Sequence, residues 1–258
     1  MTVLRHTGFM VQRQARNLMR EPIWIALLLI QPMVWLILYG QLFKNVTRLG
    51  GFGTASYVTF LAPAIVVMNS FFGATWSGMA MIGDLDRKVV ERFLATPASR
   101  LSLVLSQIVR SALTAGIQAV VILAIAWGIL GVHVHAGLAG WLIVIVVGML
   151  VNAAFAGLSQ GLALLTRREA TMITLANFIG LPLLFLSSTL LAQNQMPHWM
   201  RVAAGFNPVN WGVKASRSVV LAGTDWGSVA RHMGYLVALC VITTAWANWT
   251  FRAYRRTL

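Results

Sequence analysis

The pattern in this chain that most resembles an enzyme motif is a serine between two glycines. Residues 157–161 read Gly-Leu-Ser-Gln-Gly, which matches the GxSxG pattern of serine hydrolases. In those enzymes the serine stands on a strand-to-helix turn, whereas Ser159 lies inside a long apolar run. An intramembrane protease would pair this serine with a histidine, and His232 is the candidate. The two glycines also form GxxxG, a helix-packing motif, which is the interpretation that the apolar context favours.

Two further patterns concern metals and nucleotides. His133 and His135 form an HxH pair that can present both rings on one side of an extended segment, but two ligands fall short of the four of a typical zinc site. None of the lysines, Lys44, Lys88 and Lys214, follows the glycine that GxxxxGK[ST] requires. We therefore expect no catalytic residue, no metal and no cofactor on this chain, and no ATP hydrolysis through a P-loop of its own.

Composition indicates that these residues sit in a membrane protein. The 258 residues are 58% hydrophobic and 10% charged, against roughly 45–50% and about 25% in soluble domains. A formal charge of +14 could point to nucleic acid, but the bases lie mainly in short segments between apolar runs, where membrane proteins carry them. We expect no nucleic-acid partner. The single cysteine, Cys240, lies within an apolar run and excludes an intrachain disulfide.

The apolar runs predict an all-α integral membrane protein with six transmembrane helices, built as one domain over residues 1–258. Each run approaches or exceeds the roughly 20 residues that a spanning helix needs. In the fifth run, Pro182 predicts a kink. The predicted spans are Ile23–Phe43, Tyr57–Ile82, Ser106–Val132, Leu138–Thr166, Ala170–Leu191 and Met233–Phe251.

The distribution of basic residues predicts the orientation. An even number of spans places both termini on one side, and that side carries fourteen of the twenty bases. The richer side is the cytoplasm by the positive-inside rule. We expect a multi-pass plasma-membrane protein with both termini in the cytoplasm.

Three segments differ from ordinary termini and loops. Residues 1–21 place apolar residues on one helical face and arginines on the other, which predicts an interfacial helix; a basic disordered terminus is the alternative. Residues 84–100, DLDRKVVERFLATPASR, predict a short cytoplasmic helix whose apolar face needs a protein partner or membrane lipid. Residues 193–231 are too long and apolar for a turn, and predict short re-entrant helices at the outer mouth.

Polar residues inside the predicted spans either bond between helices or line a path. We single out Gln31, Asn69 and Asn177 as path-lining candidates. The six carboxylates all fall at or outside the predicted membrane faces, which weakens a proton-coupled mechanism. The two halves of the chain show no sequence repeat, so an inverted-repeat transporter is not supported.

The amphipathic start, the six spans and two motifs together resemble the type-2 permease subunits of ATP-binding cassette (ABC) exporters, especially the drug-resistance branch that includes the daunorubicin exporter permeases. The motifs are ERFLATPASRLSLVLSQIVR at Glu91–Arg110 and NPVNWGVKASR at Asn207–Arg217. The resemblance implies a coupling helix that docks on a separate ATPase subunit. Its expected contact residues are Asp86, Arg87, Val90, Glu91, Arg92, Phe93, Leu94 and Thr96.

The same resemblance implies two permease subunits, identical or paralogous, above two ATPase subunits that bind ATP and Mg²⁺. It implies outer re-entrant helices broken at Asn207 and Pro208, and a hydrophobic drug or lipid as cargo. Seventeen arginines against three lysines, with many glycines and alanines, indicate a bacterial source of actinobacterial type. A stand-alone secondary transporter or channel, and an intramembrane serine protease, remain the alternatives.

Overall fold

The computed structural model describes residues 22–86 and 100–254, and every regular element in these ranges is a helix. The prediction of an all-α chain is thereby confirmed for this part. The predicted interfacial helix, 1–21, and most of the predicted coupling helix, 87–99, lie outside the described residues. The elements are α2 (Pro22–Leu42), η1 (Val46–Leu49), α3 (Tyr57–Asp86), α5 (Arg100–Gly128), α6 (Gly137–Thr166), α7 (Glu169–Phe185), η2 (Gln193–Gln195), α8 (His198–Gly205), α9 (Pro208–Val220) and α10 (Trp226–Tyr254).

Four described helices are long and apolar enough to cross a membrane, against the six that we predicted. They contain the segments Tyr57–Asp84, Val104–Gly128, Gly137–Thr166 and Trp226–Arg252. Two shorter apolar stretches, Leu29–Leu42 and Glu169–Phe185, fall where the first and fifth spans were predicted. The last span begins at Trp226 rather than near Met233, so residues 226–231 belong to this helix and not to the outer segment.

The fifth predicted span is wrong in its second half. The helix α7 ends at Phe185, and its 17 residues reach only about 26 Å, less than the roughly 30 Å of a hydrocarbon core. Serine and threonine side chains take over local hydrogen bonding there: Ser187 Oγ lies 2.5 Å from the Leu184 carbonyl oxygen and 2.6 Å from Thr189 Oγ1. Such local bonds compete with helix continuation. Where we predicted a kink at Pro182, the helix ends one turn later.

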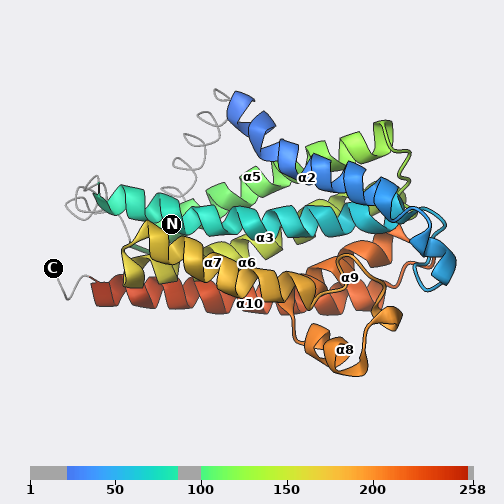
Figure 1. The fold of residues 1–258 in the computed structure, drawn as a ribbon. Coiled ribbons are helices and arrows are strands. Elements are labelled where there is room, and N and C mark those ends of the chain that lie inside the picture. The colour runs from blue at the N-terminus through green and yellow to red at the C-terminus, as the bar shows by residue number, and fades with distance from the viewer. Residues whose placement is uncertain (1–21, 87–99, 255–258) are drawn as a thin grey trace.

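The long helices lie along one common direction (Figure 1). The chain turns at residues 167–168 between α6 and α7, and α3 and α10 end at the same side of the bundle, which we call the Arg167 end. The opposite side, where α2, α5 and α9 end and α6 begins, carries residues 129–136 and is called the His133 end.

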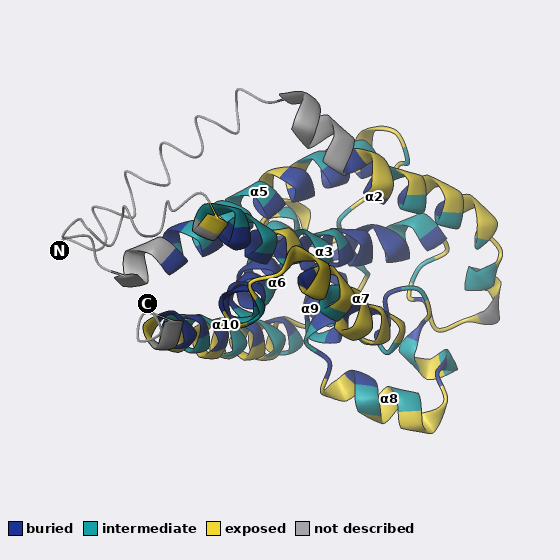
Figure 2. Ribbon diagram, turned by 60° about the vertical axis from the view of Figure 1, so that its left-hand side comes forward, coloured by how far each residue is buried: buried dark blue, intermediate teal, exposed yellow. Residues whose placement is uncertain are grey.

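The helix α6 is the centre of the bundle and packs against α3, α5, α9 and α10. Figure 2 shows buried residues concentrated along α3 and α6, and exposed ones on α7 and α8. Small residues allow this close packing. A Cβ atom at Gly157 would lie 2.9 Å from Thr243 Oγ1 on α10, and one at Gly161 would overlap the Trp246 ring. The GxxxG interpretation of this segment is therefore confirmed.

Candidate functional site

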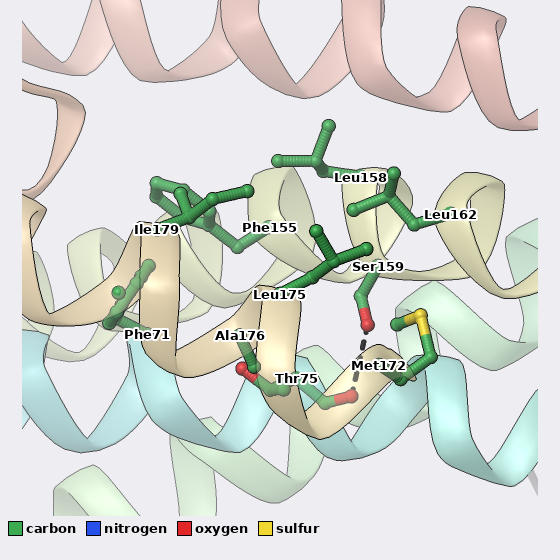
Figure 3. Close-up of a pocket in the computed structure, with 11 residues that line it drawn as sticks. Phe71, Thr75, Phe155, Leu158, Ser159, Leu162, Met172, Leu175, Ala176 and Ile179 are labelled. Carbon is green, nitrogen blue, oxygen red and sulfur yellow. Dashed lines mark hydrogen bonds between the residues drawn. The ribbon is translucent and has the colours of Figure 1, made fainter. Parts of the chain in front are cut away.

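A narrow apolar cavity lies between α3, α6 and α7 (Figure 3). Its walls are nearly all hydrocarbon. The polar side chains among them are Thr75 and Ser159, and Ser159 Oγ already donates to the Thr75 carbonyl oxygen at 2.9 Å. The lining residues are Phe71, Thr75, Phe155, Leu158, Ser159, Leu162, Met172, Leu175, Ala176, Ile179 and Gly180. This surface can hold an apolar ligand, since it offers few unsatisfied polar groups.

The α7 wall of this cavity belongs to a helix with few buried residues. Among the residues of α7, Met172, Gly180 and Leu184 are buried, whereas Phe178 is 77% exposed. The cavity volume is only about 40 Å³, well below the roughly 300 Å³ of a small drug site. A larger molecule can enter only if α7 moves away from α3 and α6.

Ser159 is a packing residue between α6 and α3. Its hydroxyl also accepts a hydrogen bond from the Gly78 backbone N–H at 3.2 Å, so it joins α6 to α3. His232, the histidine that an intramembrane protease would pair with this serine, lies in another layer of the bundle. The glycine at 157 touches Thr243, which lies eleven residues beyond His232 on α10, or about 16 Å along a helix. His232 Nδ1 instead contacts the Ser228 carbonyl oxygen at 2.7 Å.

Other polar residues also bond α6 to α3. Asn152 donates from Nδ2 to the Ser70 carbonyl oxygen at 2.9 Å, and Gln160 donates from Nε2 to Ser77 Oγ at 3.0 Å. Both amides are at most 1% exposed. The interpretation of such residues as interhelical ties is confirmed at these two positions.

The three path-lining candidates share no described contact. Gln31 is exposed on α2 and Asn177 is exposed on α7, where its Nδ2 donates to the Ile173 carbonyl oxygen of its own helix at 3.0 Å. Asn69 is half-buried and donates from Nδ2 to Gln118 Oε1 of α5 at 3.0 Å. The cavity residues were missed at the sequence level, because an apolar wall gives no local signal.

The break at Asn207 and Pro208 is a helix boundary. Asn207 caps α9, accepting a hydrogen bond from the Val209 N–H at 2.9 Å, and Pro208 occupies the first turn, where no N–H is needed. The Asn207 side chain also donates to the carbonyl oxygens of Leu183 at 2.5 Å and Leu186 at 3.1 Å. The start of α9 is therefore fixed to the end of α7.

Two further polar residues of the NPVNWGVKASR motif also bind backbone groups. Asn210 Oδ1 accepts from the Ser188 N–H at 3.0 Å, and its Nδ2 donates to the Ala204 carbonyl oxygen at 2.7 Å. Trp211 Nε1 donates to the Gly205 carbonyl oxygen at 2.7 Å. These contacts satisfy non-helical backbone, which is tolerated at membrane depth only where protein or water covers it.

Arg217 is the most buried charged side chain in the described part of the chain, and it falls in the segment 193–231 that we predicted to form short helices at the outer mouth. It is 7% exposed. Its Nε donates to the Phe60 carbonyl oxygen at 3.0 Å, while its terminal nitrogens donate to those of Ser188 and, at 2.7 Å, Thr189. Its Cζ lies 3.4 Å from the centre of the Phe60 ring. The guanidinium thus joins α9, α3 and the segment that follows α7.

At the His133 end, His133 and His135 line a hollow of about 270 Å³ together with Thr54 and Thr59. Both histidines are exposed, and His133 Nδ1 lies 2.8 Å from the Gly131 carbonyl oxygen. Within the described ranges, no group of three or more histidine, cysteine or acidic residues could hold a metal.

At the Arg167 end, the expected coupling residues are represented by Asp86, which is exposed at the last position of α3. Arg87, Val90, Glu91, Arg92, Phe93, Leu94 and Thr96 lie outside the described residues.

Comparison with known proteins gives one consistent result. The family model of the ABC-2 type transporters matches residues 5–221. The chain is 30% identical to the ycf38 transport permease of Porphyra purpurea over 226 residues, 87% of this chain and 76% of that protein. It is 26% identical to the ycf38 permease of Pyropia yezoensis over 250 residues, 96% and 81% of the two chains. It is 25% identical to the daunorubicin resistance ABC transporter permease protein DrrB1 of Streptomyces coeruleorubidus over 248 residues, 91% and 80% of the two chains.

Proposed function

Because this chain belongs to the ABC-2 type transporter family and is a transport permease, we propose that it is the membrane subunit of an ATP-powered exporter. Its cargo is a hydrophobic drug, a lipid or a similar amphiphile, which leaves from the cytoplasm or the inner leaflet. The drug-resistance relative named for daunorubicin supports this cargo class. The permease resides in the plasma membrane with both termini in the cytoplasm.

The observation that carries the cargo assignment is the apolar cavity of α3, α6 and α7. It contains no charged side chain among its lining residues, so its contribution to binding is the burial of hydrocarbon at roughly 25 cal/mol per Å². In this proposal the α7 wall moves aside for a larger cargo, since few α7 residues are buried, while the end of α7 stays bonded to Asn207. An apolar cargo entering between α7 and α6 would therefore meet a matching surface.

Energy comes from a partner in this proposal. The segment Asp86–Thr96 docks on a cassette ATPase subunit, and two such subunits, carrying ATP and Mg²⁺, serve two permease subunits that are identical or paralogous. The described carboxylates support external energy over proton coupling. Asp84, Asp86, Glu169 and Asp225 all stand at or beside helix ends, so the described spans offer no acidic proton carrier at mid-membrane.

Filling the cavity tests the cargo assignment. We expect Ala176→Trp to reduce transport of a hydrophobic drug such as daunorubicin at least tenfold, because the indole occupies the space between α3, α6 and α7. The matched control is Ala170→Trp, an exposed position of the same helix that does not line the cavity. The measurement is drug uptake into inverted vesicles that contain the permease and its ATPase.

The ATPase should co-purify with both variants, and drug-stimulated ATP hydrolysis should fall in Ala176→Trp alone. Equal transport by the two variants would show that cargo passes elsewhere. Transport that persists without any cassette ATPase would instead support the secondary transporter.

A further inference from the structure

Outside the cavity and the α7–α9 junction, aromatic and basic side chains gather between α9 and α10. The two helices pack against each other (Figure 1). Trp211 and Lys214 are three residues apart on α9, and His232 and Tyr235 are three apart on α10, so each pair shares one helix face. The rings of Trp211 and Tyr235 are 5.3 Å apart between centroids, and those of His232 and Tyr235 are 6.1 Å apart. The two faces therefore meet.

This cluster has more basic than acidic side chains. Lys214, Arg231 and Asp225 all lie within electrostatic range of the His232 ring, so the cluster holds two basic side chains against one carboxylate. The carboxylate is engaged, since Asp225 Oδ1 accepts a hydrogen bond from the Ser228 N–H at 3.0 Å. Lys214 is half-buried, and its ammonium makes no hydrogen bond or ion pair with the residues that the structure describes. An ammonium on a half-buried side chain without an anion favours binding one.

The position of the cluster along the helices matches a lipid head group. Lys214 stands six residues before the end of α9, and His232 six residues after the start of α10, which is about 9 Å from the His133 end in both cases. The 29 residues of α10 reach about 44 Å, against a hydrocarbon core of about 30 Å. Groups about 9 Å from a helix end therefore lie where acyl chains give way to phosphates.

We propose that Lys214 and His232, flanked by Trp211 and Tyr235, form a binding site for the phosphate of a phospholipid in the leaflet at the His133 end. The Lys214 ammonium supplies the charge, as lysine commonly does for phosphates. His232 contacts the Ser228 carbonyl oxygen through Nδ1 at 2.7 Å, which leaves Nε2 for the ligand. Tyr235 is 47% exposed, so its ring can cover the upper acyl chain, as aromatic residues do at membrane interfaces.

Lipid binding to the purified full-length permease tests the site. Native mass spectrometry would compare short-chain phosphatidylglycerol with the matching diacylglycerol, which lacks the phosphate. We expect Lys214→Ala to weaken phosphatidylglycerol binding about tenfold and His232→Ala to weaken it several-fold, with diacylglycerol binding unchanged. The control is Lys44→Ala, which removes an exposed lysine at the same end. If Lys214→Ala is not recovered folded, Lys214→Met removes the charge and keeps the side-chain length.

The outcomes separate the possible ligands. If excess inorganic phosphate displaces phosphatidylglycerol from the wild type, but not the residual binding of Lys214→Met, the phosphate site stands and takes free phosphate as well. If phosphate does not compete and the variants still lose the lipid, the ligand is the head group. Binding by Lys214→Ala or Lys214→Met equal to that of Lys44→Ala, or diacylglycerol bound as tightly as phosphatidylglycerol, would overturn the proposal.

Discussion

Arg217 shows how a charged side chain is retained inside this bundle without an acidic partner. Its guanidinium meets three backbone carbonyl oxygens and a phenyl ring, and the described residues give it no carboxylate. These carbonyls need a donor, because two of them belong to the segment where helical hydrogen bonding has stopped. Tyr57 Oη donates a hydrogen bond to the carbonyl oxygen of the next residue in this segment, Leu190, at 2.8 Å. The buried guanidinium and the non-helical backbone carbonyl groups therefore stabilise each other.

Removing this side chain should destabilise the fold strongly. We expect Arg217→Ala to cost about 3 kcal/mol or more of unfolding free energy, because hydrogen bonds to a charged group contribute roughly 1.5–3 kcal/mol each and the carbonyls are left unsatisfied. Arg217→Lys should be intermediate, since an ammonium lacks the planar fork and stacks poorly on Phe60. The measurement is thermal unfolding of the purified permease in detergent.

The control for this experiment is Arg201→Ala. Arg201 is exposed and makes one side-chain hydrogen bond, to the Met196 carbonyl oxygen at 3.2 Å, so its loss should change the melting temperature little. Equal melting temperatures for the Arg217 and Arg201 variants would show that the carbonyls find other donors.

The residues that bind this backbone are partly readable from sequence, and their partners are not. Asn207 followed by Pro208 is a helix-start signal, and the structure has a capped helix start there. Asn210 and Arg217 both bind Ser188, which lies 22 and 29 positions away from them along the chain. No spacing rule in a single sequence predicts contacts over such distances. Arg217 falls in a segment that we predicted to form short helices, but no sequence pattern indicated its burial, which a guanidinium with several carbonyl partners makes possible.

Among the helices, the predicted spans were right where the apolar run is uninterrupted. The runs that became α3, α5, α6 and α10 are uninterrupted, so length and hydropathy sufficed to find them. The fifth run was equally apolar through Leu191, but Ser187, Ser188 and Thr189 lie in its last turns. Hydropathy averages over such residues, whereas their hydroxyls make the local hydrogen bonds that end α7 at Phe185. Hydropathy alone therefore placed the end of the fifth span six residues beyond the end of α7.

The packing of α3 on α6 gives a prediction at this scale. We expect Gly78→Ala to destabilise the permease by about 1–3 kcal/mol, because the new Cβ would lie 2.6 Å from the Ser159 carbonyl oxygen and 2.9 Å from Met172 Cε. Backbone lies on both sides of this contact, so relief requires α3 and α6 to separate. Thermal unfolding in detergent, with α-helical content followed by circular dichroism, measures the effect.

The control is Gly83→Ala in the same helix, where a Cβ would meet nothing within 4 Å. That variant should melt at or above the wild-type temperature, since alanine is favoured over glycine in helices by about 1 kcal/mol. A destabilisation of the same size at both positions would mean that helix propensity or insertion decides the result, and not the α3–α6 contact.

The whole molecule is divided into two functional ends by the direction of its helices. The Arg167 end carries the exposed Arg167, Arg168 and Arg252, and the proposal places it in the cytoplasm by the positive-inside rule. The His133 end carries Lys44 and Arg48 and the hollow of the two histidines. Arg217 lies in α9, within the segment that we predicted to form short outer helices, whereas Arg231 belongs to α10.

Single-cysteine labelling tests this orientation. Cys240 is the only cysteine in the chain, so Cys240→Ala gives a cysteine-free background. In that background we expect His133→Cys, at an exposed position, to react with a membrane-impermeant maleimide on intact cells. Arg168→Cys, also exposed, should react only after the membrane is permeabilised. The reverse pattern would place the Arg167 end outside and remove the basis for an ATPase partner there.

If the Arg167 end is cytoplasmic, the segment that follows Asp86 is positioned to meet the ATPase. Its sequence gives Val89, Val90, Phe93 and Leu94 one helical face, with Glu91 and Arg92 beside it. We expect Phe93→Ala to remove a buried aromatic anchor, which commonly costs about 2 kcal/mol at an interface, or roughly thirtyfold in affinity. Co-purification of the ATPase in detergent and cargo-stimulated ATP hydrolysis should both fall, while membrane insertion stays normal.

The control is Trp199→Ala, an exposed aromatic of α8 distant in sequence from this segment. If Phe93→Ala retains the ATPase and full stimulation while the segment loses affinity for vesicles, the segment attaches to the membrane surface. It then does not couple ATP hydrolysis to transport.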